Sequence, residues 1–308
     1  MSAAVPVPGA GPGAQALSRA SAVPRLPAWA RQPSPLAPGA RTLRVLLREN
    51  ALNTVCEEAR CPNLGECFSR GTATFMLLGD RCTRRCSYCS VGTAKPLPPD
   101  PDEPERVAAA AVRLGLRYVV LTSVNRDDLP DGGAAHFAAT VLAARRALPE
   151  AEVEVLTPDF KGDRRALAAV LGARPTVFNH NIETVPRLFP RVRPQGSYRL
   201  SLDVLAAARE LRPDVPTKSG LMVGLGETDA EVLSLLRDLR GQGVEIVTIG
   251  QYLRPTRQHE AVDRYLPPSA FEALAAEARA IGFPTVYAGV FVRSSYNASE
   301  VFRSGSAR

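Results

Sequence analysis

Long apolar runs, lysine and early acidic residues are scarce or missing in this 308-residue chain. No stretch of about 18 apolar residues occurs, so the sequence predicts no transmembrane helix. It also shows no signal peptide with an apolar central run. Lysine occurs only at Lys95, Lys161 and Lys218, whereas arginine is abundant, a bias typical of a high-GC genome. No acidic residue precedes Glu49, although six arginines do.

Residues 1–40 are rich in Ala, Pro, Gly and Ser without periodicity, and we expect them to form a disordered tail. An acid-free tail with arginines is typical of an organelle-targeting peptide, but its prolines break amphipathic helices. A high-GC genome would also produce such a tail. We therefore expect a bacterial cytoplasmic protein, with the mitochondrial matrix as the alternative. Because most of the net charge of +7 lies before Glu49, the rest is near neutral, which argues against nucleic-acid binding.

All six cysteines lie between Cys56 and Cys89. Disulfides would more often be spread along a chain of this length, so we interpret the cysteines as reduced metal ligands. Three of them form the pattern C-x3-C-x2-C, here called the Cys82 triplet (Cys82, Cys86, Cys89). A zinc site usually needs a second C-x2-C or a pair of histidines, and the histidines of this chain are scattered (His136, His180, His259). The triplet therefore predicts a 4Fe–4S cluster with one iron free to bind a small molecule.

The other three cysteines precede this pattern and are separated by four and five residues; they are called the Cys56 triplet (Cys56, Cys61, Cys67). Pro62 and Gly65 predict turns that let this segment fold back, so that its three cysteines can bind one metal site. The alternative is a set of buried thiols or zinc ligands. Because two adjacent triplets use every cysteine in the chain, we favour a second iron–sulfur cluster.

Beyond the cysteines, the chain alternates apolar strand-like runs with amphipathic helical patterns, after a first helix predicted over 41–54. The predicted strands lie near 75–79, 118–122, 153–156, 176–182, 218–223, 245–249 and 285–290. Strands that alternate with helices predict a parallel sheet. About six βα units are two short of a closed eight-fold barrel. We therefore expect an α/β fold, a partial (β/α)6 TIM-like barrel that is open on one side for a bulky substrate.

Several motifs resemble known families. The Cys82 triplet, with Tyr88 beside its last cysteine, resembles the signature of the radical S-adenosylmethionine superfamily. Both triplets together closely resemble the lipoyl synthase family, over about residues 42–300. The further motifs are Gly71-Thr-Ala-Thr-Phe-Met, Thr122-Ser-Val-Asn-Arg-Asp-Asp-Leu-Pro-Asp-Gly-Gly-Ala, Phe178-Asn-His-Asn-Ile-Glu-Thr-Val, Gly220-Leu-Met-Val-Gly-Leu-Gly-Glu and Arg293-Ser-Ser-Tyr.

The resemblance implies a radical SAM barrel over 73–290, covered by an N-terminal extension over 41–72 and a C-terminal segment over 291–308. The Cys82 triplet would hold a catalytic 4Fe–4S cluster that cleaves S-adenosylmethionine to methionine and a 5′-deoxyadenosyl radical. The Cys56 triplet would hold an auxiliary 4Fe–4S cluster. Its fourth ligand would be Ser295 rather than Ser294, although serines in such a stretch are otherwise typical of a turn.

The implied reaction inserts two sulfur atoms, taken from the auxiliary cluster, at carbons 6 and 8 of an octanoyl chain linked to a lysine of a lipoyl carrier domain. Implied partners are octanoylated carriers (2-oxoacid dehydrogenase acyltransferase subunits and glycine cleavage H protein), an electron donor such as ferredoxin or flavodoxin, and an iron–sulfur cluster carrier. Neither nucleic acid nor a membrane is implied. The alternatives are a biotin-synthase-like or methylthiotransferase-like enzyme and, more distantly, an iron–sulfur regulatory or nucleic-acid-binding protein.

Polar residues near the predicted strand ends are candidates for contacts with S-adenosylmethionine, and each has a structural salt bridge or hydrogen bond as its alternative role. The candidates are Tyr88, Asn179, Asn181, Glu183, Arg193, Lys218, Gln251 and Tyr252. The loop aspartates either contact the carrier or cap the helix that follows Gly132 (Asp127, Asp128, Asp131). Residues 224–227 lack the spacing of a phosphate-binding loop and predict a tight turn beside the cofactor.

Overall fold

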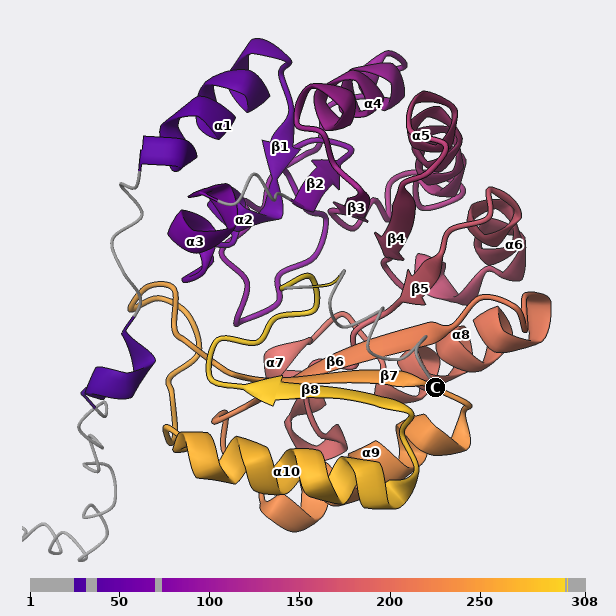
Figure 1. Ribbon diagram of the computed structural model, residues 1–308. Helices are drawn as coiled ribbons and strands as arrows, with labels where there is room; N and C mark the ends of the chain where they lie inside the picture. Colours follow the sequence, from indigo (N-terminus) through magenta and orange to yellow (C-terminus); the bar gives the residue numbers. More distant parts are fainter. Residues whose placement is uncertain (1–24, 32–37, 70–73, 297, 299–308) are drawn as a thin grey trace, which may run out of the picture.

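The computed structural model describes residues 25–31, 38–69, 74–296 and 298, and a single eight-stranded sheet forms its centre (Figure 1). β1 is antiparallel to β2, and every later pair is parallel. The strands lie in chain order, and β8 does not pair with β1, so the prediction of a partial (β/α)6 barrel is confirmed. They are β1 (Asn53–Thr54), β2 (Thr74–Leu77), β3 (Tyr118–Ser123), β4 (Glu152–Leu156), β5 (Val177–Asn179), β6 (Thr217–Val223), β7 (Ile246–Gln251) and β8 (Thr285–Gly289).

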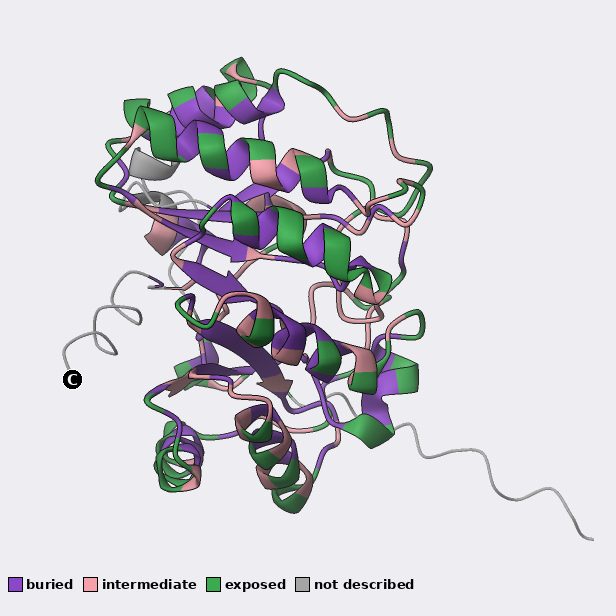
Figure 2. Ribbon diagram, turned by 90° about the vertical axis from the view of Figure 1, so that its right-hand side faces the viewer, coloured by how far each residue is buried: buried purple, intermediate pink, exposed green. Residues whose placement is uncertain are grey.

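Long helices between these strands cover the outer face of the sheet, and Figure 2 shows the buried strands behind helices with exposed outer sides. In α9, Thr228 and Glu231 form a reciprocal cap, and the buried leucines recur at helical spacing. The helices are α4 (Glu103–Arg113), α5 (Ala134–Ala147), α6 (Arg164–Gly172), α8 (Tyr198–Leu211), α9 (Asp229–Gly241) and α10 (Pro268–Ile281); shorter elements are η2 (Phe160–Gly162), η3 (Pro186–Leu188) and α7 (Phe189–Val192). Across the described ranges, no helix is both long and apolar enough to cross a membrane.

The N-terminal extension lies beside the first edge of the sheet and consists of α1 (Pro38–Glu49), α2 (Val55–Glu58) and α3 (Leu64–Ser69), whereas the preceding η1 (Ala28–Ala30) lies apart from them, near Tyr265. The helix predicted over 41–54 ends early, because Ala51 takes a left-handed backbone (φ 47°) and residues 53–54 pair with β2. The turn predicted at Gly65 is wrong, since this glycine lies inside α3.

Part of the predicted disordered tail is ordered. In η1, Ala30 is buried, and Trp29 lies edge-on to Tyr265 with ring centroids 6.5 Å apart. The prediction of disorder is therefore wrong for residues 25–31, and also for residues 38–40, which lie in α1. Residues 1–24 and 32–37 lie outside the described residues, as do 71–73 of the Gly71 motif and 299–308.

After β8 the chain turns back into the mouth of the barrel (Figure 1). Two strand glycines make room for this segment. A Cβ atom on Gly250 would lie 2.1 Å from the carbonyl oxygen of Val292, and one on Gly220 would lie 2.6 Å from Oγ of Ser294. A larger residue at Gly250 would displace the backbone of the C-terminal segment, whereas one at Gly220 would crowd the side chains of Ser294, Thr248 and Asn181.

Candidate functional site

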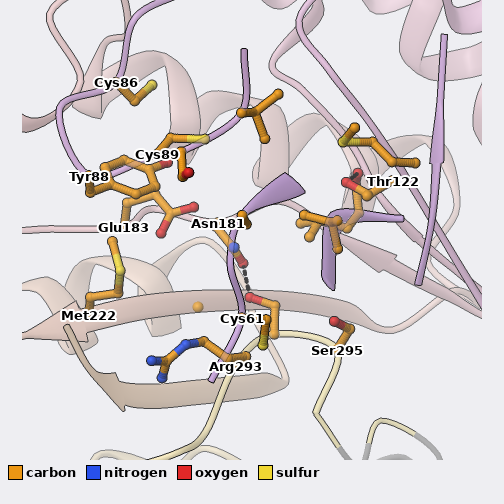
Figure 3. Close-up of a pocket in the computed structure, with 18 of the residues that line it drawn as sticks. Cys61, Cys86, Tyr88, Cys89, Thr122, Asn181, Glu183, Met222, Arg293 and Ser295 are labelled. Carbon is orange, nitrogen blue, oxygen red and sulfur yellow. Dashed lines mark hydrogen bonds between the residues drawn. The ribbon is translucent and has the colours of Figure 1, made fainter. Parts of the chain in front are cut away.

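A cavity of about 320 Å³ opens where the carboxyl ends of the parallel strands meet, the usual site of chemistry in such barrels. Both cysteine triplets and the C-terminal segment contribute to its wall. Figure 3 shows Cys61 and Ser295 on one side, and Cys86, Cys89 and Tyr88 on the other. Five cysteines line the cavity (Cys56, Cys61, Cys82, Cys86, Cys89), whereas Cys67 lies in α3 behind them and is not among the lining residues.

The loop of the Cys82 triplet follows β2 and is held by backbone hydrogen bonds to distant segments. Cys82 N donates to Gly92 O (2.8 Å), and Ser87 N donates to Val192 O (3.0 Å). On the far side, the ring of His259 contacts the carbonyl oxygen of Cys89 (Nε2 to O, 3.0 Å). These bonds hold the loop in a conformation in which all three thiols line the cavity.

All six cysteines are free thiols. Burial raises the pKa of Cys56 to about 11 and that of Cys89 to about 12. Burial also raises the pKa values of Cys61 and Cys86, although nearby arginines oppose the shift. Without a metal these thiols stay protonated near neutral pH and are poor nucleophiles. Their chemistry fits metal ligands rather than nucleophilic catalysts.

Within the described ranges, no group of three or more His, Cys, Asp or Glu side chains is arranged to hold a single metal ion. A cluster presents a separate iron to each thiolate, so its ligands stand farther apart than those of one ion. Five thiols around one cavity, none of them grouped for a single ion, therefore fit iron–sulfur clusters.

The C-terminal segment is tied to the segment of the Cys56 triplet. Asn63 Nδ2 donates to Phe291 O (2.6 Å), and the hydroxyl of Tyr296 donates to Glu66 (3.1 Å). These bonds bring Ser295 to the wall that also carries Cys56 and Cys61. The two ends of the chain thus form this side of the cavity together.

The two serines of the Arg-Ser-Ser-Tyr motif have different surroundings. Ser294 donates a hydrogen bond to Asn181 Oδ1 (2.7 Å). The hydroxyl of Ser295 makes no hydrogen bond to any described residue and lines the cavity. Ser295 is therefore the serine whose oxygen is available to a ligand.

Five of the eight residues predicted to contact the cofactor line the cavity: Tyr88, Asn181, Glu183, Arg193 and Tyr252. Arg193 Nη1 donates to Asn181 O (2.9 Å). Burial raises the pKa of the Glu183 carboxyl. Its hydrogen bonds with Asn181 and Tyr88 partly oppose this rise in pKa. Glu183 also has a left-handed backbone (φ 71°), held by its N–H to Gly220 O and by Met222 N to its carbonyl. Strain of this kind persists where surrounding structure enforces it, typically at functional sites.

Asn179, Lys218 and Gln251 are not in the cavity wall, and their side chains make structural contacts, the alternative role considered for them. Lys218 pairs with Glu154 in the interior of the barrel (Nζ to Oε1, 2.9 Å), and both side chains are 1% exposed. Asn179 Nδ2 donates to the same carboxylate (3.0 Å). Gln251 Nε2 donates to backbone carbonyls of three residues (Val223, Tyr252, Arg264). Tyr252 does line the cavity, and its hydroxyl donates to Glu260 O.

The three loop aspartates have structural partners. Asp131 caps α5 by accepting from Gly133 N (2.9 Å), which confirms the capping alternative. Asp128 pairs with Arg126, and Asp127 pairs with Arg84. Residues 224–227 form the predicted tight turn, in which the Glu227 carboxylate accepts from two backbone N–H groups, but the turn does not line the cavity.

Sequence reasoning missed several cavity residues, of which His180 is the most buried. Its Nδ1 hydrogen bonds to Thr157 O (2.9 Å), while its Nε2 has no partner. Burial lowers the pKa of His180 to about 4, so the ring is neutral at pH 7 and Nε2 is an acceptor. Its place directly after β5 was a usable signal, because residues that follow the strand ends of such barrels lie at the usual site of chemistry.

A model of the radical SAM superfamily matches residues 76–239. With the open parallel barrel and the cysteine-lined cavity, this makes the chain a radical SAM enzyme, whose cofactors are 4Fe–4S clusters and S-adenosylmethionine. The curated relatives define a narrower family within this superfamily. The lipoyl synthase of Thiobacillus denitrificans is 54% identical over 92% of this chain and 91% of the relative. That of Rubrobacter xylanophilus is 56% identical over 89% and 85%. The chain belongs to the lipoyl synthase family.

Solved structures agree at the level of the fold. The [FeFe]-hydrogenase maturase HydG has a TM-score of 0.54 at 13% identity, with 80% of this chain and 65% of that chain covered. Methylornithine synthase (PylB) has a TM-score of 0.50 at 16% identity, with 73% and 66% covered. Family membership favours lipoyl synthase over the biotin-synthase-like, methylthiotransferase-like and regulatory alternatives.

Proposed function

We propose that this enzyme inserts two sulfur atoms, at carbons 6 and 8, into an octanoyl chain carried on a lysine of a lipoyl carrier domain. The observation that carries the proposal is the shared cavity wall: thiols from both triplets and Ser295 surround one space. A reaction that needs a radical source and a sulfur source beside the same substrate requires this arrangement.

The Cys82 triplet would hold the cluster that, with S-adenosylmethionine bound, supplies hydrogen abstraction from an unactivated carbon. The cavity residues around it complement the two charged ends of the methionine moiety. Glu183 offers a carboxylate for its amino group, and Arg193 offers a guanidinium for its carboxylate. Asn181, held between Ser294 and Arg193, orients these groups.

The Cys56 triplet and Ser295 would hold the auxiliary cluster as sulfur donor. A serine oxygen is a harder ligand than thiolate and a poorer match to iron in a sulfide cluster. Ser295 would therefore be the weakest of the four ligands, and the three thiolates would be the stronger ones.

Apolar side chains between the two triplets suit the octanoyl chain (Met76, Leu156, Leu221, Met222, Val292). They exclude water from the space in which a reactive carbon must meet only its intended partner. For partners, we propose the carrier domains of 2-oxoacid dehydrogenases and the glycine cleavage H protein, a ferredoxin or flavodoxin as reductant, and a cluster carrier. The bacterial relatives support a cytoplasmic location.

The test is mass spectrometry of an octanoylated carrier peptide, incubated anaerobically with reconstituted enzyme, reductant and S-adenosylmethionine. The expected product has gained two sulfurs and lost hydrogens. Cys56→Ala should keep cofactor cleavage and lose sulfur insertion, whereas Cys82→Ala should lose both. Cofactor cleavage with an unchanged octanoyl peptide would contradict the proposal.

A further inference from the structure

Arg84 lies in the loop of the Cys82 triplet, between the first and second cysteines, and has no assigned role. Arg84 is only 6% exposed, although its side chain carries a full charge. Its guanidinium makes two bidentate pairs. Nε and Nη2 donate to Asp127 (2.7 and 2.9 Å), and Nη1 and Nη2 donate to Asp159 (2.6 and 2.8 Å).

The two carboxylates come from different parts of the barrel. Asp127 follows β3 and Asp159 follows β4, so Arg84 joins the cluster loop to two successive strand ends. Thr83 adds to this attachment, because its hydroxyl donates to Asn125 O (2.9 Å) and accepts from Asp127 N (3.1 Å). Side chains therefore add to the backbone hydrogen bonds that hold the loop between Cys82 and Cys86.

The backbone of Arg84 touches the cluster ligand itself. Its N–H donates to Sγ of Cys82 (3.4 Å). Hydrogen bonds to the sulfurs of an iron–sulfur cluster are one determinant of its reduction potential. Arg84 thus makes four hydrogen bonds through its guanidinium and one through its backbone N–H, to the sulfur of Cys82. A buried ion pair by itself is weak evidence of a contribution to stability. A gain in stability therefore does not explain why Arg84 is paired beside the cluster ligands.

We propose that Arg84, clamped by Asp127 and Asp159, is a positioning residue that fixes the Cys82 sulfur and sets the reduction potential of the catalytic cluster. The clamp keeps the N–H of Arg84 directed at the sulfur, which stabilises the reduced, more negative cluster. This inference rests on the assignment of the Cys82 triplet to that cluster. It does not depend on the identity of the carbon substrate.

The test compares full-length, anaerobically reconstituted variants by iron and sulfide content, by redox titration, and by the part of the EPR spectrum that changes when S-adenosylmethionine is added. Arg84→Lys keeps the charge but cannot form two bidentate pairs. It should retain iron, lower the midpoint potential of the catalytic cluster, and slow cofactor cleavage about ten- to hundredfold, as is typical when groups that orient metal ligands are altered.

Asp127→Asn opens only the half-exposed side of the clamp and should cause a smaller shift in the same direction. It also keeps the test decisive if an Arg84 variant folds poorly. The matched control is Arg85→Gln, because this neighbouring side chain is exposed and only its backbone N–H is engaged, by Gln195.

Unchanged potential, EPR spectrum and cleavage rate in both Arg84→Lys and Asp127→Asn would overturn the proposal. So would equal changes in Arg85→Gln. Because cofactor cleavage is measured without an octanoyl peptide, a failure here is distinct from a failure of the proposed sulfur insertion.

Discussion

Ser294 and Ser295 are adjacent, yet their different contacts predict different phenotypes. Ser295→Ala should leave iron content and cofactor cleavage near normal but slow sulfur insertion at least about tenfold, because the auxiliary cluster loses its oxygen ligand. Ser294→Ala should instead weaken use of S-adenosylmethionine, because Asn181 loses its 2.7 Å hydrogen bond. Both effects are measured by quantifying 5′-deoxyadenosine and thiolated peptide in the same reaction. The opposite pattern would assign the ligand to Ser294.

Lys218 has a structural role, and its removal should affect stability before it affects cofactor binding. Lys218→Met leaves the Glu154 carboxylate buried without its cation, and loss of one partner of a buried pair costs about 3–5 kcal/mol. Urea unfolding of the apoprotein should report this loss. Arg199→Met is the control, because its exposed pair with Asp203 contributes only about 0.3–0.5 kcal/mol. Equal stability of both variants would contradict the buried-pair argument.

The site residues could be predicted from sequence where spacing alone defines the chemistry. The two cysteine triplets satisfy that condition, because six thiols at short, fixed separations have few other uses. Asn179, Lys218 and Gln251 do not satisfy it. A polar residue in a barrel strand has the same sequence signature whether it reaches the mouth of the barrel or pairs deep inside, as Lys218 does with Glu154.

At the scale of elements, sequence patterning predicted the parallel strands from their apolar runs and the long helices from their periodicity. It missed β1 and η1, which have two and three residues and no period to detect. The antiparallel pairing of β1 depends on contacts with β2, and the order in η1 depends on packing against Tyr265. Such tertiary contacts leave no local pattern.

Gly250 in β7 is the strand position on which the C-terminal segment most depends. In Gly250→Ala the new methyl group would meet Val292 O at 2.1 Å, so residues 292–295 must move and Ser295 must leave the cavity wall. We expect sulfur insertion to fail while iron content stays at about eight per chain, because the three thiolates of the Cys56 triplet still hold the auxiliary cluster. Cofactor cleavage should persist.

Gly172→Ala is the matched control for Gly250→Ala. A Cβ atom there meets nothing within 4 Å, and the residue ends α6 far from the barrel mouth. It should be neutral or stabilising by about 0.4–1 kcal/mol through reduced freedom of the unfolded chain. Full sulfur insertion in Gly250→Ala would show that the segment tolerates displacement.

At the scale of the whole molecule, the cavity is built from three parts of the chain that are distant in sequence. The open barrel supplies the floor, the segment of the Cys56 triplet supplies one wall, and the C-terminal segment closes it. The direct ties between the two ends are few, chiefly Asn63 to Phe291 and Tyr296 to Glu66. A cluster held by Cys56, Cys61, Cys67 and Ser295 would add covalent connections exactly where these hydrogen bonds are sparse.

Cluster loading should therefore depend on pH and should stabilise the two ends of the chain together. Burial raises the pKa of Cys56 to about 11 and of Cys89 to about 12, so cluster binding must release protons from thiols that are protonated near neutral pH. Iron loss to a chelator should accelerate as the pH falls from about 8.5 to 6.5, because protons compete with iron for sulfur. Hydrogen exchange of the stripped protein should then increase in residues 53–67 and 290–296 while β3 to β7 stay protected. Uniform deprotection, or iron loss that does not vary with pH, would show that the clusters are not what joins the two ends.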